Sequence, residues 1–367
     1  MRISMLFMIT AVFFFCSCNI DNTTKPSGGD DTSLVVIKDS VVFSFAFTGC
    51  NRVGWESGAT PSTANHIPLD SIFSDMQNLK RKPELFFNLG DIVRAEQPDV
   101  TVLDGQLDAW TQLLAVKNFD ASGIKMIAVP GNHELLQSYE QGPEYPLKGS
   151  TEVWSKYMSK YVPANASFAT KKKNELNDLS FSFTQGTVGF IVLNTDTYND
   201  PQDGQKFGFE GVAPIKWAIS EIESLKANAA IKHIFVLGHR PYYIYGTPEF
   251  GHKGLPNGGT LWNALQENDV VAMLSAHTHD YYRYQHNNKG PTQVIAGNAG
   301  SPGSSKFFGY SLINVYKSGK TQLISRGYCV PSDYKSAPTG NMQLRDSTYL
   351  SIDGNSNPLE YPYLGCK

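Results

Sequence analysis

Five polar residues that can bind metal ions follow strand-like stretches of this chain. They stand in four short motifs, GDIV (90–93), GNHE (131–134), GHRP (238–241) and HTHD (277–280). The five donors are Asp91, Asn132, His239, His277 and His279. Oxygen and imidazole ligands together suit zinc, iron or manganese better than calcium. Each residue alone could be a turn residue, a cap or a packed histidine, but five donors exceed what one four-coordinate ion requires. The set predicts two metal ions that share a bridging carboxylate, a pair able to clamp a phosphate and activate water.

Cys50 ends another strand-like stretch, and three roles are open to it: a small buried residue, half of a disulfide or a metal ligand. Of the five cysteines, Cys329 and Cys366 both lie in the loop-rich C-terminal stretch and are the expected disulfide. Cys50 is then left over, followed by Asn51 and Arg52. Arg52 could hold a phosphate oxygen through its fork of donors, or it could be a solvated loop arginine.

Apolar runs of strand length alternate with amphipathic segments along the chain. The expected strands are 41–47, 84–89, 124–129, 188–194, 231–237, 270–276 and 292–297, and helical faces recur within 69–79, 107–114 and 215–225. This alternation predicts an α/β fold in which helices cover the sheets. Because ligands collect at the carboxyl ends of such strands, we expect the motifs to meet at one edge.

The motifs GDIV, GNHE, GHRP and AHTHDYYR resemble, in order and spacing, those of the calcineurin-like metallophosphoesterases over roughly residues 41–300. LGHRPYY, HTHDYYR and AGNAGSPG are most similar to the purple acid phosphatase branch. The resemblance implies a four-layer α/β/β/α sandwich with two mixed β-sheets flanked by helices. It also implies hydrolysis of phosphate esters with two metal ions.

The resemblance further implies a role for each motif residue. The implied ligands of the second ion are Asp91, Asn132, His239 and His277. Asp91 would bridge to the first ion, which His279 would also bind. His133 would hydrogen-bond the phosphate or protonate the leaving group, and a metal-bound hydroxide would attack phosphorus in line.

Two departures change what the resemblance implies. Purple acid phosphatases have a Tyr three residues after the bridging Asp, which binds ferric iron and gives the colour; here that position is Arg94. The family's opening Asp and His, which bind the first ion, align with Cys50 and Arg52. However, TGCNR resembles the opening motif of alkaline phosphatase D-like phosphodiesterases, where the Cys is a thiolate ligand of iron. Cys50 is therefore predicted to bind the first ion, and Arg52, Asn132 and His133 to bind substrate.

Other polar residues carry weaker predictions. Arg240 and Arg283 follow metal motifs and could bind phosphate or brace the loops against a carboxylate. His233 lies inside a strand-like stretch and is predicted to be a packed histidine. The loop histidines His66, His252 and His286 have no identifiable partner. Segment 135–180 is expected to shape the substrate pocket, or else to be a surface excursion.

The N-terminus is predicted to be a targeting segment. Residues 1–18 contain Arg2, a short apolar run and a Ser-Cys pair ending at Cys18 that resembles a lipoprotein processing site, with an ordinary secretory signal as the alternative. The protein is therefore expected to be exported to the periplasm, the outer membrane or the cell surface. Membrane contact is expected only through a lipid anchor at Cys18.

Composition suggests the bounds of the domains, and the net charge limits the expected binding partners. Residues 19–35 are an expected polar tether, 36–330 the phosphoesterase domain and 331–367 a C-terminal cap packed on it. The formal charge of −3 gives no support for a surface that binds nucleic acid.

These features predict an exported phosphatase or phosphodiesterase that uses two ions, with iron, zinc or manganese favoured. The purple acid phosphatase-like motifs favour phosphate monoesters as substrates, whereas the Cys50 motif favours diesters, and both stay open. The alternative is a catalytically impaired surface lipoprotein that uses the fold as a binding module, supported only by Cys50 in place of Asp.

Overall fold

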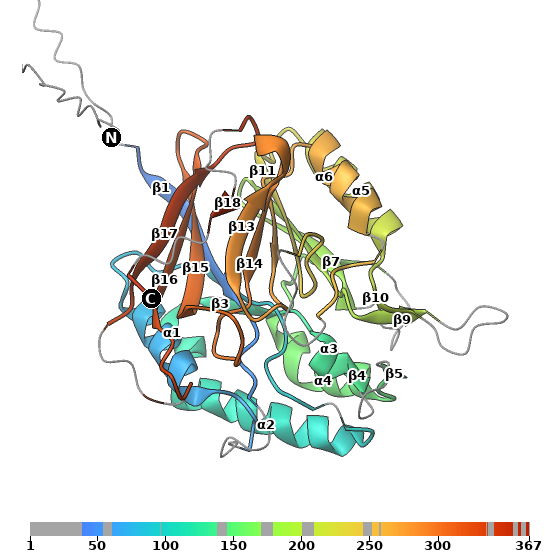
Figure 1. The fold of residues 1–367 in the computed structure, drawn as a ribbon. Helices are drawn as coiled ribbons and strands as arrows, with labels where there is room; N and C mark the ends of the chain where they lie inside the picture. Colours follow the sequence, from blue (N-terminus) through green and yellow to red (C-terminus); the bar gives the residue numbers. More distant parts are fainter. Residues whose placement is uncertain are drawn as a thin grey trace, which may run out of the picture. The chain divides into compact units, whose positions relative to one another are not determined.

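Two mixed β-sheets form the centre of the fold in the computed structural model (Figure 1). The structure describes residues 39–53, 61–95, 97–137, 145–169, 179–199, 209–244, 252–256, 258–334, 336, 341–354, 359–360 and 365–366. The chain divides into Met1–Lys38 and Asp39–Lys367, and every described element belongs to the second unit. The predicted signal segment, Cys18 and the tether lie outside the described residues.

The first sheet has six strands, and its parallel half comes first in the chain. In spatial order the strands are β17 (Gln343–Leu350), β16 (Thr321–Cys329), β15 (Phe307–Tyr316), β1 (Val41–Thr48), β2 (Leu85–Asn88) and β3 (Lys125–Ala128). β1, β2 and β3 are parallel, and the other neighbours are antiparallel. The carboxyl ends of β1, β2 and β3 therefore lie at the same edge.

The second sheet has eight strands with a parallel centre. In spatial order they are β18 (Leu359–Glu360), β13 (Tyr281–Gln285), β14 (Thr292–Ala296), β12 (Ala272–Ser275), β11 (His233–Gly238), β8 (Val188–Leu193), β7 (Phe181–Gln185) and β6 (Ser167–Phe168). β8, β11, β12 and β14 are parallel. Two small ribbons pair β4 (Leu136–Gln137) with β5 (Tyr145–Pro146) and β9 (Thr197–Asn199) with β10 (Phe209–Val212).

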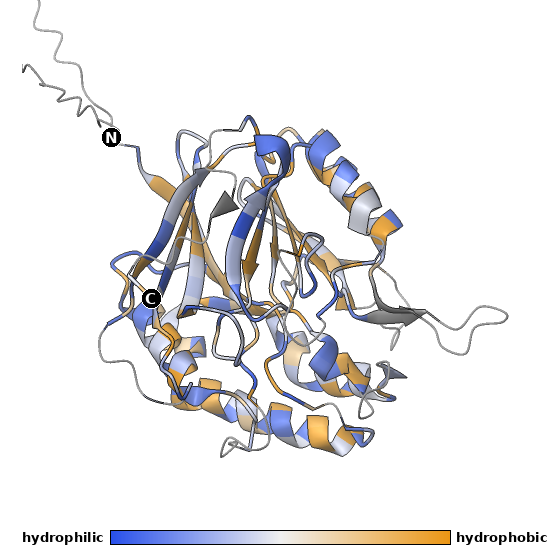
Figure 2. Ribbon diagram, in the orientation of Figure 1, coloured by the Kyte–Doolittle hydropathy of each residue, from blue (hydrophilic) through white to orange (hydrophobic). Residues whose placement is uncertain are grey.

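Helices cover the outer faces of the two sheets. The helices are α1 (His66–Asn78), α2 (Val100–Val116), α3 (Asn132–Leu135), α4 (Ser150–Met158), α5 (Ile215–Ala227) and α6 (Gly258–Glu267), with single 3₁₀ turns at Asp120–Ser122, Ser159–Tyr161 and His286–Asn288. None of the helices in the described part of the chain has the length and apolar character needed to cross a bilayer. Figure 2 shows hydrophobic and hydrophilic residues mixed along α2 and α5, as amphipathic helices require.

Three separate clusters of buried apolar side chains correspond to the three interfaces of a four-layer sandwich. One cluster joins the inner faces of the two sheets, for example Phe45 of β1 with Phe190 of β8. A second joins the first sheet to α1, α2 and α4, and a third joins the second sheet to α5 and α6. β1 shows how one strand serves two interfaces, because Phe45 faces the other sheet while Ala46 faces the helices. The predicted α/β/β/α architecture is confirmed.

The predicted strands are all present, with ends that differ from the prediction by at most two residues. The antiparallel strands β15, β16 and β17 were not predicted as one unit. β17 lies in the segment 331–367, which was expected to be a cap; it forms the edge of the first sheet, and β18 pairs with β13 of the second. The expected disulfide between Cys329 and Cys366 is confirmed, and it closes a loop with a sequence separation of 37 residues.

Segment 135–180 contains α4, whose buried residues Trp154 and Met158 belong to the same cluster as Leu107 of α2. This part of the segment therefore extends the outer helical layer. Residues 138–144 and 170–178 of the segment lie outside the described residues.

Replacing Phe45 by Ala should destabilise the whole sandwich. The ring is fully buried, and its centroid lies 5.0 Å from that of Phe235, 5.1 Å from Phe190 and 5.7 Å from Phe87. We expect a loss of about 3–5 kcal/mol in the free energy of unfolding, measured by urea denaturation. The control, Phe168→Ala, removes a ring that is 45% exposed on the edge strand and should cost less than about 1 kcal/mol. Similar losses for the two variants would contradict the assignment of the inter-sheet core.

Candidate metal centre

The ends of five strands bring their polar residues to one place. Cys50 follows β1, Asp91 follows β2, Asn132 begins the short helix after β3, His239 follows β11, and His277 and His279 follow β12. Backbone hydrogen bonds connect the loops: Cys50 N donates to Gly90 O at 2.9 Å, and Ala276 N donates to His239 O at 2.9 Å. Gly49 N, after β1 of the first sheet, donates to Ala296 O of β14 in the second sheet at 2.8 Å, so the two sheets are also joined to each other beside the cluster.

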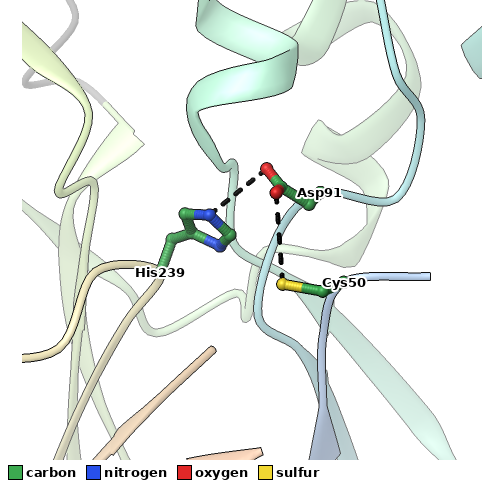
Figure 3. A group of neighbouring side chains, drawn as sticks. All are labelled: Cys50, Asp91 and His239. Atoms are coloured by element: carbon green, nitrogen blue, oxygen red, sulfur yellow. Dashed lines mark hydrogen bonds and ion pairs between the residues drawn. The ribbon is translucent and has the colours of Figure 1, made fainter. Parts of the chain in front are cut away.

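Asp91 lies at the middle of this cluster, and its two carboxylate oxygens face different partners (Figure 3). Oδ1 lies 3.2 Å from His239 Nε2, whereas Oδ2 lies 4.0 Å from Cys50 Sγ and 4.0 Å from His279 Nε2. The carboxylate is fully buried. This is the geometry that a carboxylate bridging two cations requires.

The donors on the Oδ1 side form the second ligand group: Asp91 Oδ1, Asn132 Oδ1, His239 Nε2 and His277 Nδ1. His239 Nε2 lies 3.1 Å from Asn132 Oδ1 and 3.1 Å from His277 Nδ1. Ligand atoms on one zinc ion, with bonds near 2.1 Å, are separated by about 3.0–3.4 Å. The spacing of this group therefore fits a single metal ion.

The donors on the Oδ2 side form the first ligand group: Cys50 Sγ, Asp91 Oδ2 and His279 Nε2. Cys50 Sγ also accepts a hydrogen bond from His277 N at 3.1 Å, which lowers the cost of negative charge on the sulfur. Donor atoms of Cys50 and Asp91 also lie within 4.8 Å of those of His239, which belongs to the second group, so the two groups adjoin each other. The first group joins a soft sulfur to a hard oxygen and an imidazole, a set that suits iron or zinc.

Backbone carbonyls fix which nitrogen of each histidine faces the cluster. The Nδ1–H of His239 donates to Leu89 O at 2.7 Å, and that of His279 donates to Pro302 O at 2.8 Å. In both rings Nε2 is then the nitrogen that faces Asp91. Carbonyl partners of this kind are the usual way in which proteins orient histidine ligands of metals.

Burial and charged neighbours shift the pKa values of the groups in the cluster. Burial and the charge of Asp91 raise the pKa of the Cys50 thiol well above its usual range, so a nearby cation is needed to make the thiolate. Burial alone would raise the pKa of Asp91, but the charges of His239 and His133 hold it well below its usual range. Burial would lower the pKa of His239, but Asp91 raises it to about 9. A protonated His239 thus supplies the positive charge that a metal ion would supply.

Four residues of the site have left-handed backbone conformations, which cost free energy in residues other than glycine. The φ angles are 58° at Cys50, 54° at Asp91, 69° at His277 and 50° at His279. The close approach of two loops adds a further requirement, because a Cβ atom at Gly131 would lie 2.3 Å from Asp91 Oδ1. These backbone conformations and the glycine at position 131 allow the side chains of the two loops to approach one another.

His133 lies beside the bridging carboxylate. Its Nδ1–H donates to Arg94 O at 2.9 Å, and its Nε2 lies 3.8 Å from Asp91 Oδ2. The role of His133 at the phosphate stays a prediction. Arg94 contributes its carbonyl oxygen at this point, and no phenol stands there.

Both arginines after the metal motifs pair with carboxylates: Arg240 braces its loop, which is one of the two predicted roles, whereas Arg283 joins β13 to β17. Arg240 Nε pairs with Asp196 at 2.5 Å, and Arg283 Nε pairs with Asp346 at 2.8 Å. His233 is buried in β11, as predicted, at the opposite end of the strand from the cluster.

Two residues of the site escaped prediction. Glu134 was quoted in GNHE, but nothing in the sequence assigned it a function. His252 is 13 positions after His239, too far for a motif; its ring centroid lies 4.9 Å from that of His277 and 4.7 Å from that of His279. The remaining loop histidines lie elsewhere, since His66 contacts Ser62 and His286 contacts Tyr284.

Glu134 fixes the positions of both neighbouring loops. Its carboxylate accepts hydrogen bonds from Asp91 N at 3.1 Å, Val93 N at 3.1 Å and Gly131 N at 2.7 Å. Burial and the charge of Asp91 raise its pKa to about 7. The loop of Asp91 and the loop of Asn132 share this one acceptor. Glu134 therefore positions the candidate ligands through the backbone and is not a candidate ligand itself.

Comparisons with known proteins agree with this geometry. A family model described as calcineurin-like phosphoesterase matches residues 63–281, more than half of the chain. A comparison with curated proteins finds no match.

Several solved structures are similar in fold. A purple acid phosphatase from yellow lupin seeds has a TM-score of 0.51 at 18% identity, over 86% of this chain and 55% of that one. A dimetal phosphatase from Danio rerio has a TM-score of 0.53 at 11% identity, over 86% and 100%. A structure of PhoD has a TM-score of 0.56 at 13% identity, over 87% and 71%. This chain spans about half the length of the lupin protein.

Replacing Glu134 by Ala should destabilise the protein even without metal. Three buried N–H groups lose their acceptor, at about 1–3 kcal/mol each, so we expect a loss of at least about 3 kcal/mol in urea denaturation of metal-stripped protein. Glu134→Gln should lose less, because an amide oxygen in the place of Oε2 still accepts from Asp91 N and Gly131 N. The control is Glu84→Ala, since the Glu84 side chain is 44% exposed. A loss below about 1 kcal/mol for Glu134→Ala would contradict the positioning role.

Proposed function

The chain belongs to the calcineurin-like phosphoesterases, and we propose that it is an exported, dinuclear metal-dependent hydrolase of phosphate mono- or diesters. The observation that carries the proposal is the bridging geometry of Asp91. One carboxylate oxygen faces Asn132, His239 and His277, and the other faces Cys50 and His279. The names of the lupin purple acid phosphatase and the Danio rerio dimetal phosphatase support the same chemistry.

The two ligand groups would hold one ion each. When bound, iron, zinc or manganese ions supply Lewis-acid polarisation of the phosphoryl oxygens and make nearby water more acidic. Cys50 restricts the first position to metals that accept a thiolate, which favours iron or zinc. Asp91 holds the two positions together through its buried carboxylate.

The chain's own residues bind and orient the substrate. Asn132 places its amide oxygen 3.1 Å from His239 Nε2 in the second ligand group, and its amide nitrogen is a donor suited to a phosphoryl oxygen. His133 keeps its Nδ1–H on Arg94 O, so in the doubly protonated ring the Nε2–H is the donor that would pass its proton to the leaving oxygen, leaving the neutral imidazole. Arg52 offers guanidinium donors to the phosphoryl oxygens. No tyrosinate–iron colour is expected, because the position that would carry the Tyr is Arg94.

Export is supported by two features of the chain. The N-terminal sequence has the features of a signal segment, and Cys18 is the candidate site of a lipid anchor. The disulfide between Cys329 and Cys366 suits an oxidising compartment. We therefore place the enzyme in the periplasm, the outer membrane or the cell surface, with residues 19–35 as a tether.

Metal analysis combined with two nitrophenyl substrates tests the proposal. We expect about two ions per chain and hydrolysis of nitrophenyl phosphate, of bis-nitrophenyl phosphate, or of both. A chelator should abolish turnover, and iron, zinc or manganese should restore it. Asp91→Asn should lower kcat/KM at least about a thousandfold, since metal-ion catalysis is worth several kcal/mol. The control, Asp108→Asn, changes an exposed residue of α2 and should have no effect.

The alternative is a non-catalytic binding module, for which Cys50 in place of Asp is the only support. Fewer than one bound ion and no turnover of either substrate would exclude the enzyme and favour that alternative.

Replacing Cys50 tests the first ligand group separately. Cys50→Ala should lose one of the two ions and, in cobalt-substituted protein, the charge-transfer absorption of a thiolate–metal bond. Cys50→Asp should keep two ions with a changed metal preference. Full metal content and activity in Cys50→Ala would show that Cys50 is only a buried core residue.

A further inference from the structure

Arg52 has a fixed backbone and a side chain whose donors are only partly used. Its backbone forms a bridge with Ala64, and its carbonyl accepts a hydrogen bond from Ser301 Oγ at 2.8 Å. Arg52 Nη2 donates to His279 Nε2 at 3.4 Å. Arg52 Nε is buried and has no hydrogen-bond partner among the described residues. A buried guanidinium N–H without an acceptor is costly, so this side chain is suited to a ligand that supplies one.

The contact with His279 uses the atom that a metal ion would need. The Nδ1–H of His279 donates to Pro302 O at 2.8 Å, so Nε2 carries the only free lone pair of the ring. That lone pair can accept from Arg52 or bind a cation, but it cannot do both. Arg52 and the first ion are therefore alternatives at His279.

We propose that Arg52 competes with the first ion for His279 Nε2, and that its release from His279 makes the guanidinium a clamp for the phosphoryl group of the substrate. The inference rests on the proposed function, because it concerns how the first ion and the phosphoryl group bind at that same site. The contact of the guanidinium with His279 lies at the first ligand group, so binding of the first ion requires a change in the position of the arginine.

Charge explains why the released guanidinium would bind an anion. In the metal-free protein Arg52 lies near the negative charge of Asp91, which helps to keep the carboxylate ionised. Two bound ions would reverse the local charge, and the guanidinium would then be surrounded by cations. A phosphoryl group supplies both the negative charge and the acceptors for the Nε–H and Nη–H donors.

The competition has a consequence for metal binding that can be measured. The first ion should bind more weakly than the second, because it must take His279 Nε2 from Arg52, whose guanidinium stays positively charged beside that position. Inorganic phosphate should in turn strengthen the first ion, since it draws Arg52 away from His279 and linkage between two ligands is reciprocal.

Calorimetric titration of metal-stripped protein with zinc chloride tests the inference. In the wild type we expect two zinc ions with unequal affinities. Arg52→Ala should tighten the weaker site about tenfold or more, since the competing hydrogen bond from a charged donor is removed. Arg52→Met, which keeps the apolar stem, should do the same and guards against a folding defect in the Ala variant. Arg81→Ala is the control, because Arg81 is 46% exposed and pairs with Glu84.

The same variants loaded with zinc should bind inorganic phosphate about tenfold more weakly than the wild type, again by calorimetry. Unchanged affinity of the weaker zinc site in both Arg52 variants would overturn the competition while leaving the proposed function intact. Unchanged phosphate affinity would overturn the clamp. A wild type that binds no zinc would instead overturn the proposed function itself.

Discussion

A buried negative charge at Asp91 is the constraint on which the rest of the site depends. The carboxylate is removed from water at the edge where the two sheets meet, and an ion in such a place requires partners that hold opposite charge. In the metal-free protein His239 supplies that positive charge. The other side chains around the Asp91 carboxylate carry donor atoms of the kinds that bind cations. Glu134 adds a second buried carboxylate, which fixes the loops through backbone N–H groups rather than through a cation. Strained backbone at Cys50 and Asp91 shows that the fold accepts a cost to keep these side chains in place.

The layers, and the meeting of the motif residues at one place, could be predicted from the sequence because both depend on local patterns. Strand-length apolar runs gave the strands, and a polar residue directly after a strand must lie at the edge of a sheet. Contacts between distant residues could not be predicted in this way. The contact of His252 with His277 and His279 depends on the path of a loop, and no periodicity reports it. Glu134 acts on backbone N–H groups, and Pro302 acts through its backbone carbonyl oxygen. Because nearly every residue type carries these atoms, the sequence does not reveal such contacts. The hairpin of β15 and β16 has both faces buried in part, so its apolar pattern is not regular enough to identify the sheet.

Cys50 and Arg52 distinguish the first ligand group from a set made only of oxygen and nitrogen donors. Cys50 nevertheless faces the Asp91 carboxylate, as a ligand would. The sulfur faces the same carboxylate oxygen as His279 and accepts a backbone hydrogen bond, so it occupies the position of a ligand. Arg52 adds a permanent positive charge beside that position and contacts His279. In the proposed centre these two residues would act together: the thiolate would add affinity for a soft metal, while the arginine would oppose a cation at His279. We therefore propose that the first position is the one whose affinity can be adjusted.

The most direct test of this account is anomalous X-ray diffraction at the zinc absorption edge, from crystals of the protein grown with zinc. The account predicts two peaks on either side of the Asp91 carboxylate, one in contact with Asn132, His239 and His277 and the other with Cys50 and His279. A map without a peak in bonding contact with Asp91 would contradict it.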